Sequence, residues 1–339
     1  MNTLIIGGTR NLGRLLTQAL LEAGHAVTVL NRGITPNDLS PGVDRLVCDR
    51  TDPQQFHHTL QGHNFDAIVD MVLYKGSEAE AAVKTLNGYT GHYIFISTGQ
   101  VYLVREDIVR PFREDEYAGR LIPPPKDNTY PYEEWTYGKE KRDAEDVFAA
   151  SFASQDFPYT SLRLPMVNSQ NDPFNRLYGY FLRLQDGGPL LVPETPRHSL
   201  RHVYGPDVIR AIMNLIENGP GKSRAYNISQ DETVSLDEFL ALLGDLVGHR
   251  PQIVRLKRSL LDANGFLPDC SPFSERWMSE LDNSSSKTDL NMVYTPLPVY
   301  LRQLVEHYQS AQLPPPPSYR RRQAEIHFLQ GAARDFQPQ

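Results

Sequence analysis

The stretch Thr3-Leu4-Ile5-Ile6-Gly7-Gly8-Thr9-Arg10-Asn11-Leu12-Gly13 decides the fold of this 339-residue chain. Its first residues predict a short buried strand, and a glycine-rich turn follows at once. A helical pattern then runs to about Gly24, and a second apolar run covers 26–30. Strand, glycine turn, helix and strand in this order are typical of a dinucleotide-binding site. We therefore expect an α/β protein with a doubly wound parallel sheet.

Each glycine of that turn has an expected steric role. Gly7 allows the tight turn, Gly8 lets the backbone approach a pyrophosphate, and Gly13 lets the helix pack closely on the sheet. The N-terminus of the helix offers its N–H groups to the anion. The residues predicted to bind the cofactor here are Gly7, Gly8, Thr9, Arg10, Asn11, Leu12 and Gly13.

The end of the second strand bears on the choice between NAD and NADP. It reads Asn31-Arg32-Gly33, where NAD-binding proteins commonly place a carboxylate for the ribose 2′-hydroxyl. No carboxylate here repels a 2′-phosphate, and the planar guanidinium groups of Arg32 and Arg10 suit one. The sequence thus favours NADP over NAD, with Asn31 and Arg32 at the cofactor.

Tyr137 and Lys141 are four residues apart, so on a helix their side chains project from the same face. A nearby ammonium group favours the phenolate form and lowers the pKa of a tyrosine. Such a tyrosine can exchange a proton with a substrate oxygen while a hydride moves at the neighbouring carbon. The pair predicts a redox enzyme.

Strand and helix patterns continue to alternate beyond the second strand. Strands are expected at 45–48, 67–72 and 92–97, with one helix ending near 60 and another over 77–86. This alternation indicates βαβ units. The expected organisation is a dinucleotide-binding domain over 1–165 with further core elements around 202–228, a substrate lobe from 166–200 and 229–310, and a proline-rich, basic tail over 311–339.

Composition indicates a cytoplasmic enzyme. The net charge of −7 disfavours a nucleic-acid partner, because dedicated binders usually have a basic face. No run of 18 apolar residues occurs, so no membrane span is expected. Cys48 and Cys270 do not suggest a disulfide framework. The histidines have no cysteine or carboxylate partners at ligand spacing, so no metal is expected.

Together these motifs resemble those of the extended short-chain dehydrogenase/reductases, on the branch of the NAD-dependent epimerases and dehydratases. The glycine turn and Asn31-Arg32-Gly33 look most like an atypical subgroup. That subgroup includes the chloroplast stem-loop-binding proteins and bacterial epimerase-like proteins. The resemblance implies a Rossmann fold with a smaller C-terminal substrate lobe, a small-molecule substrate such as a nucleotide sugar, and a homodimer.

The resemblance also implies roles for single residues. In this family the fifth strand ends in a Ser or Thr ahead of a Val-Tyr pair, and here that segment reads Ser97-Thr98-Gly99-Gln100-Val101-Tyr102. Thr98 matches the catalytic Ser/Thr, with Ser97 as the alternative. Tyr137 and Lys141 match the catalytic pair.

Further cofactor contacts follow from the same resemblance. Asp49 matches the residue beside the adenine ring, and its neighbour Arg50 is expected at the cofactor too. Pro165 lies in the stretch after the sixth strand that turns toward the nicotinamide.

The chain departs from the family directly after Thr98. Dehydratases carry acidic residues where this chain has Gly99 and Gln100, and neither of these can act as a general base. A 4,6-dehydratase is therefore disfavoured. The expected substrate contacts are Gln100, Asn168 and Arg201.

Three functions stay open at this point. The first is epimerase or oxidoreductase chemistry at a secondary alcohol or ketone of a nucleotide sugar, with Thr98, Tyr137 and Lys141 as acid/base machinery. The second is an NADPH-dependent reductase of a small carbonyl metabolite. The third is a non-catalytic protein that binds a dinucleotide or RNA, and the intact catalytic set argues against it.

Overall fold

The computed structural model describes residues 1–34, 39–219, 222–311 and 313–335 of the chain. Their contacts divide the chain into two compact units. Unit 1 consists of Met1–Val167, His202–Ser229 and Ser279–Tyr294. Unit 2 consists of Asn168–Arg201, Gln230–Met278 and Thr295–Gln339.

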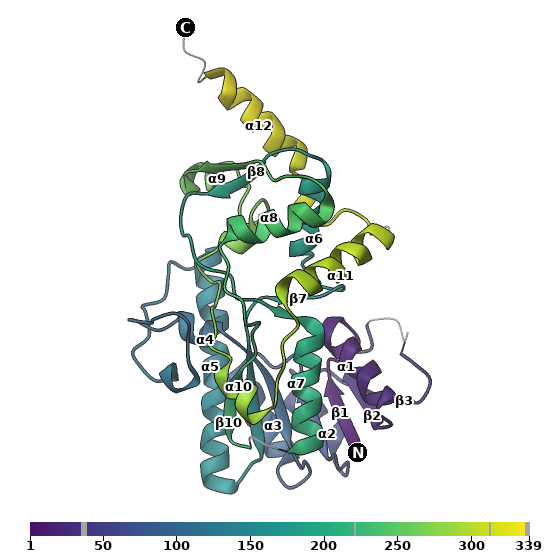
Figure 1. The fold of residues 1–339 in the computed structure, drawn as a ribbon. Coiled ribbons are helices and arrows are strands. Elements are labelled where there is room, and N and C mark those ends of the chain that lie inside the picture. Colours follow the sequence, from purple (N-terminus) through teal and green to yellow (C-terminus); the bar gives the residue numbers. More distant parts are fainter. Residues whose placement is uncertain (35–38, 220–221, 312, 336–339) are drawn as a thin grey trace. The chain divides into compact units, whose positions relative to one another are not determined.

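Unit 1 is built on a seven-stranded parallel sheet (Figure 1). The strand order is β10-β6-β5-β4-β1-β2-β3, so the direction of winding reverses between β1 and β4. Reversal of this kind places helices on both faces, and the predicted doubly wound α/β fold is confirmed. The strands are β1 (Asn2–Ile6), β2 (Ala26–Asn31), β3 (Val43–Val47), β4 (Ala67–Asp70), β5 (Tyr93–Thr98), β6 (Tyr159–Leu164) and β10 (Arg224–Asn227).

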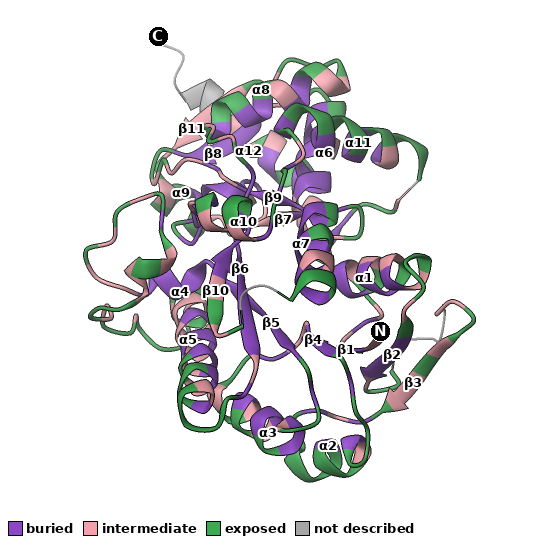
Figure 2. Ribbon diagram, turned by 60° about the horizontal axis from the view of Figure 1, so that its bottom comes forward, coloured by how far each residue is buried: buried purple, intermediate pink, exposed green. Residues whose placement is uncertain are grey.

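Two apolar cores cover the two faces of this sheet. Helices α1 (Asn11–Glu22) and α7 (Gly205–Asn218) fill one core with side chains such as Leu16 and Ile212. The other core lies beneath α2 (Pro53–Leu60), α3 (Gly76–Leu86) and α5 (Tyr130–Gln155) and contains Phe56 and Phe148. Figure 2 shows the buried strands and the exposed outer sides of the helices. Because both faces are covered, the central strands are buried and rich in apolar residues.

Helix α5 carries both Tyr137 and Lys141. Its N-cap is Thr129, whose hydroxyl accepts a hydrogen bond from the Tyr132 amide at 3.4 Å, and Pro131 lies in its first turn. A Cβ at Gly138 would come within 2.8 Å of the Gln100 carbonyl oxygen. Glycine at this position therefore lets α5 pack directly against α4 (Gln100–Leu103), the short helix that follows β5.

The rest of unit 1 consists of short elements. The charged segment after α4 contains a 3-10 helix and a buried side chain, Phe112, which is 1% exposed. Its carbonyl oxygen accepts a hydrogen bond from the Asn227 amide group at 2.9 Å, which ties the segment to β10. The short elements are η1 (Glu114–Tyr117), β9 (Val203–Tyr204) and α10 (Ser284–Asp289), and β7 (Val167–Asn168) contains the last residue of the first segment of unit 1 and the first residue of unit 2.

Unit 2 is mainly helical, with one pair of parallel strands. Its elements are α6 (Arg176–Gln185), β8 (Leu190–Pro193), α8 (Leu236–Val247), β11 (Ile253–Leu256), α9 (Arg258–Ala263), η2 (Pro272–Ser274), α11 (Leu297–Ser310), η3 (Pro317–Tyr319) and α12 (Arg322–Asp335). Part of the proline-rich, basic tail packs into this unit. Arg183 of α6 forms an ion pair of 2.6 Å with Glu325, and Arg322 forms one of 2.7 Å with Asp186. Arg183, Arg322 and Glu325 are all at most 2% exposed.

Candidate functional site

The glycine turn after β1 is held in a shape that excludes other side chains. Gly7 has φ +91°, and its amide donates to the Leu30 carbonyl of β2 at 2.9 Å. A Cβ at Gly13 would collide with the Gly7 carbonyl and come within 2.8 Å of the Gly8 Cα. Gly8 is also constrained by the sheet, because a Cβ at this position would come within 2.8 Å of the Val29 side chain. The turn is thus pressed against both β2 and α1.

The N-terminus of α1 suits an anion. Arg10 is its N-cap and makes no side-chain capping hydrogen bond, and the first turn carries no acidic residue. A phosphate at this position would meet the positive end of the helix dipole without competition from a carboxylate. Arg10 is exposed and Thr9 is partly exposed, whereas the Leu12 side chain belongs to the apolar core. These features make the glycine turn suitable for the phosphates of a dinucleotide.

The end of β2 combines the predicted residues with one that sequence reasoning missed. The Asn31 side-chain oxygen accepts hydrogen bonds from the Gly33 amide at 2.9 Å and from Arg45 Nη2 at 2.9 Å. Arg45 lies on β3, so its position beside Asn31 depends on strand pairing. Arg32 is exposed. Asp49 lies two residues beyond the end of β3, and hydrogen bonds from Thr51 lower the pKa of its carboxyl group.

Arg50, which was predicted at the cofactor, is buried and held by two carboxylates. Its guanidinium is 6% exposed and forms ion pairs with Asp70 at 2.8 Å and with Glu78 at 3.0 Å. The Tyr93 hydroxyl donates to the same Asp70 carboxylate at 2.6 Å. Arg50 therefore serves to neutralise a buried carboxylate at the end of β4. Sequence reasoning missed this role because the partner residues lie 20 and 28 positions further along the chain.

Lys141 lies in the interior of unit 1, at the carboxyl ends of β4 and β5. Its ammonium nitrogen donates to the main-chain oxygens of Leu73 at 2.5 Å and of Ile96 at 2.8 Å. Burial lowers the pKa of Lys141 to about 7, although Asp70 and Glu78 act in the opposite direction. The amine is therefore poised between its charged and neutral forms near neutral pH.

Tyr137 lies one turn of α5 before Lys141, on the same face, as the spacing predicted. The Lys141 nitrogen is 5.9 Å from the centre of the Tyr137 ring. Tyr74 lies beside both residues, with its ring centre 6.2 Å from that of Tyr137 and 4.8 Å from the Lys141 nitrogen. Tyr137 is partly exposed, so its hydroxyl is not sealed in the core. Sequence reasoning did not single out Tyr74, which carries no motif signal.

The structure separates the two candidate hydroxyls at the end of β5. Ser97 donates to the Glu145 carboxylate at 2.5 Å, and Glu145 pairs with Arg163 at 2.6 Å in the interior. Successive residues of a strand point to opposite faces, so Thr98 is directed away from this ion pair. Thr98 is 8% exposed, and its hydroxyl oxygen accepts a hydrogen bond from the Gln100 amide at 3.2 Å. Of the two residues, Thr98 is the one whose hydroxyl is not held by the buried pair.

Gln100 brings a carboxylate into this region that the sequence did not reveal. Its side-chain amide donates to the Glu134 carboxylate and lies 3.4 Å from the Glu134 main-chain oxygen. Glu134 is on α5, three residues before Tyr137, so both side chains lie on one side of the helix. Acidic residues are absent directly after Thr98, but α5 supplies one from elsewhere in the chain.

The other predicted residues fall in different places. Pro165 is buried and follows Leu164, whose carbonyl oxygen accepts a hydrogen bond from the Gly99 amide at 2.8 Å. Asn168 and Arg201 belong to unit 2. There the Asn168 amide lies 3.3 Å from the Tyr300 hydroxyl, and Arg201 donates to a main-chain oxygen at 2.9 Å.

Two kinds of site are absent from the part of the chain that the structure describes. No three His, Cys, Asp or Glu side chains of these residues gather as metal ligands would. None of the described helices combines the length and apolar character of a membrane span. Cys48 and Cys270 are both buried and carry free thiols.

With its glycine turn after β1, the doubly wound sheet of unit 1 is a Rossmann fold. The family model described as "NAD dependent epimerase/dehydratase family" matches residues 3–229. The chain belongs to the NAD-dependent epimerase/dehydratase family.

Two curated relatives and one solved structure illustrate the similarity. The chloroplast stem-loop binding protein of 41 kDa b of Arabidopsis thaliana is 26% identical over 248 residues, which cover 69% of this chain and 60% of that protein. The 2′-dehydrokanamycin reductase of Streptomyces kanamyceticus is 28% identical over 88 residues, 26% of this chain and 25% of that protein. The chain therefore matches less than two thirds of the length of either relative. The UDP-glucose 4-epimerase of Thermotoga maritima, solved with UDP-glucose, shares the fold with a TM-score of 0.72 at 18% identity, over 92% of this chain and 100% of that chain.

Proposed function

We propose that the protein is an NAD(P)-dependent epimerase or oxidoreductase that acts at a secondary alcohol or ketone of a nucleotide sugar. The observation that carries this proposal is that the glycine turn and the Tyr137–Lys141 pair lie together at the carboxyl ends of the strands. Val72 lies against Gly7, and the next residue, Leu73, accepts a hydrogen bond from Lys141. A dinucleotide held by the turn would extend past the same strand ends that carry the pair.

Each residue of the set has a defined role in the proposed mechanism. Tyr137 gives a proton to the substrate oxygen or takes one from it, and Thr98 hydrogen-bonds that oxygen and orients it. Lys141 binds the ribose next to the nicotinamide and, when protonated, favours the phenolate of Tyr137. When it is bound, the nicotinamide group supplies a hydride acceptor and donor.

We infer that NADP is preferred over NAD. Arg10 and Arg32 are both exposed at the turn and at the end of β2, where a 2′-phosphate would lie. Asn31 offers no negative charge there, and Arg45 adds a further guanidinium beside it. The family name specifies NAD dependence, and the arginines of this chain support binding of the phosphorylated form.

Two alternatives each have an observation in their favour. An NADPH-dependent reductase of a small carbonyl compound is favoured by the similarity to a reductase over 88 residues. A non-catalytic nucleic-acid-binding protein is favoured by the similarity to a stem-loop binding protein. The proposed Tyr137, Lys141 and Thr98 set gives enzyme chemistry more weight than the second alternative.

The test is a set of incubations with candidate sugar nucleotides, with and without added NADPH. Absorbance of the reduced nicotinamide and chromatography of the products are followed together. An isomer that forms with no net absorbance change supports an epimerase, because the hydride returns to the same carbon. Consumption of one NADPH for each product molecule identifies a reductase. If neither signal is seen in protein that still binds the dinucleotide, the result contradicts the proposed activity.

A further inference from the structure

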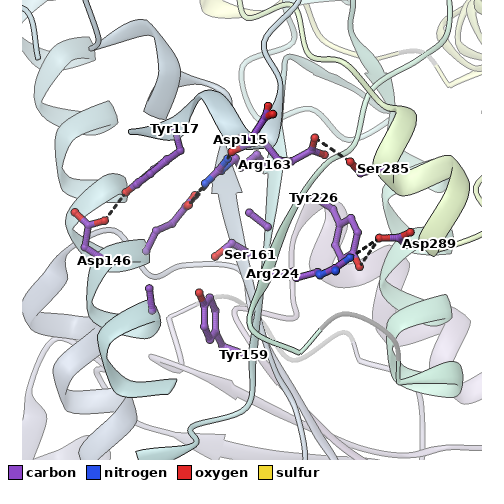
Figure 3. A pocket seen from close by; sticks show the side chains of 14 residues that line it. Asp115, Tyr117, Asp146, Tyr159, Ser161, Arg163, Arg224, Tyr226, Ser285 and Asp289 are labelled. Atoms are coloured by element: carbon purple, nitrogen blue, oxygen red, sulfur yellow. Dashed lines mark hydrogen bonds and ion pairs between the residues drawn. The ribbon is translucent and has the colours of Figure 1, made fainter. Parts of the chain in front are cut away.

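A cavity in unit 1 lies away from the candidate catalytic residues. It has a volume of about 430 Å³ and is bounded by η1, α5, β6, β10 and α10 (Figure 3). We call it the β10-edge pocket, because Arg224, Ala225 and Tyr226 of β10 form one wall. Neither Tyr137 nor Lys141 lines it. A cavity of this volume lies within the range of about 300–1,000 Å³ that is usual for small-molecule sites.

The charges that line the β10-edge pocket leave an excess of carboxylate. Its two arginines are already neutralised, because Arg163 pairs with Glu145 at 2.6 Å and Arg224 with Asp289 at 2.8 Å. Glu114, by contrast, has no ion-pair partner among the described residues. It accepts hydrogen bonds from the Asn227 amide at 2.9 Å and from Ser285 at 3.1 Å.

Asp146 is the second carboxylate of the pocket without a cationic partner. It extends from α5 and accepts a hydrogen bond from the Tyr117 hydroxyl at 2.8 Å (Figure 3). No lysine, arginine or histidine lies within ion-pair distance of it in the part of the chain that the structure describes. Two unpaired carboxylates on the walls of one cavity favour the entry of a cation.

An unpartnered hydroxyl independently points to a ligand. Ser161 of β6 is 0% exposed, and its Oγ atom has no hydrogen-bond partner among the described residues. An unsatisfied hydroxyl in the interior is unfavourable, because it has lost its hydrogen bonds to water without replacement. Tyr159 lies two residues earlier on the same face of β6, and its side chain also lines the pocket (Figure 3). The described residues provide no hydrogen bond to its hydroxyl either.

We propose that the β10-edge pocket binds a hydroxylated primary amine of about the size of one sugar ring. Its ammonium group would pair with Asp146, whose carboxylate accepts a hydrogen bond from Tyr117 but has no cationic partner among the described residues. Its hydroxyl groups would hydrogen-bond Ser161 and Tyr159, which have hydroxyls but no partner. This site is separate from the proposed catalytic residues, so its occupancy does not depend on the proposed activity.

Glucosamine and glucose form a matched pair of probes, because they differ only in an amino group that replaces a hydroxyl. Isothermal titration calorimetry at low ionic strength should show saturable binding of glucosamine and at least 10-fold weaker binding of glucose. Asp146→Asn keeps an acceptor for Tyr117 and removes the charge, so it should weaken glucosamine binding by about 10-fold or more. Ser161→Ala should weaken it about 3- to 10-fold. The control Asp44→Asn changes an exposed carboxylate on β3, at the opposite edge of the sheet, and should have no effect.

Two further measurements separate this site from the proposed active site. Tyr137→Phe should leave glucosamine affinity unchanged, and Asp146→Asn should leave NADP affinity unchanged. Equal binding of glucose and glucosamine would overturn the proposal, as would glucosamine binding that survives both pocket substitutions. Loss of glucosamine binding in Tyr137→Phe would also overturn it, because it would assign the amine to the catalytic residues. Absence of saturable binding to the folded wild-type protein is equally decisive against it.

Discussion

The ammonium nitrogen of Lys141 donates to the main-chain oxygen of Ile96 at 2.8 Å, two residues before Thr98. This contact fixes α5 against the end of β5 and brings a titratable amine into the interior. Lys141 and Tyr137 are part of the same helical segment, Tyr137-Gly138-Lys139-Glu140-Lys141. The position of Tyr137 therefore depends on the same packing. Tyr137, Lys141 and the end of β5 are thus held in place by the same contacts.

The protein without cofactor should become more stable as the pH rises above 7 because of Lys141. Its folded pKa of about 7 lies below the value of 10.5 for the free side chain. Between these values the unfolded chain binds more protons than the folded one, so the free energy of unfolding rises with pH. The contribution is at most about 1.4 kcal/mol for each pH unit.

Urea unfolding of Lys141→Met between pH 6 and 10 measures this effect. The variant lacks the titrating amine, so its stability relative to the wild type should be greatest near pH 6 and should decline as the pH rises. Lys139→Met removes a partly exposed lysine from the same helix and serves as the control. A difference between variant and wild type that does not vary with pH would contradict the lowered pKa.

Tyr137→Phe should bind the dinucleotide with nearly unchanged affinity and turn over roughly 10²–10⁴-fold more slowly. Only the hydroxyl is removed, and that group is the proposed proton donor and acceptor. Fluorescence titration with NADPH checks the binding, and the sugar-nucleotide assay checks the rate. Full activity in this variant would exclude Tyr137 as the acid/base residue.

Arg32→Ala should weaken NADP binding by roughly 10- to 100-fold and NAD binding much less, because only NADP carries the 2′-phosphate. A lost charge-assisted contact costs about 1.5–3 kcal/mol. Calorimetry with both cofactors measures the two losses, and Arg302→Ala, an exposed arginine of α11, is the control. Equal losses for NAD and NADP would show that Arg32 does not recognise the phosphate.

Glu134→Gln should reduce kcat by about 10- to 100-fold while the affinity for cofactor is retained. The Glu134 carboxylate accepts a hydrogen bond from Gln100 and lies one turn before Tyr137, so it can orient a substrate group or take a proton from it. The pH dependence of kcat is compared between this variant and Glu133→Gln, an exposed neighbour on the same helix. An unchanged kcat and pH profile in Glu134→Gln would limit Glu134 to a structural role.

The features that depend only on neighbouring residues could be predicted from the amino-acid sequence. The glycine spacing in Gly7–Gly13 and the apolar runs around it predicted the turn and the doubly wound sheet, because steric fit and periodicity are local properties. The four-residue spacing likewise placed Tyr137 and Lys141 on one face of a helix. These predictions needed no knowledge of distant contacts.

The partners of the polar side chains, by contrast, depend on contacts between residues that are distant in the sequence. Arg50 was expected at the cofactor, yet it pairs with Asp70 and Glu78, which come from a later strand and helix. Thr98 and Ser97 differ because Ser97 meets the Glu145–Arg163 pair, and Glu134 reaches Gln100 across 34 residues. Charges and hydrogen bonds depend on distance in space, and the parallel pairing of strands separated in sequence sets that distance. The sequence therefore specified the scaffold and the spacing of Tyr137 and Lys141, whereas folding decided which polar groups are neutralised inside the protein.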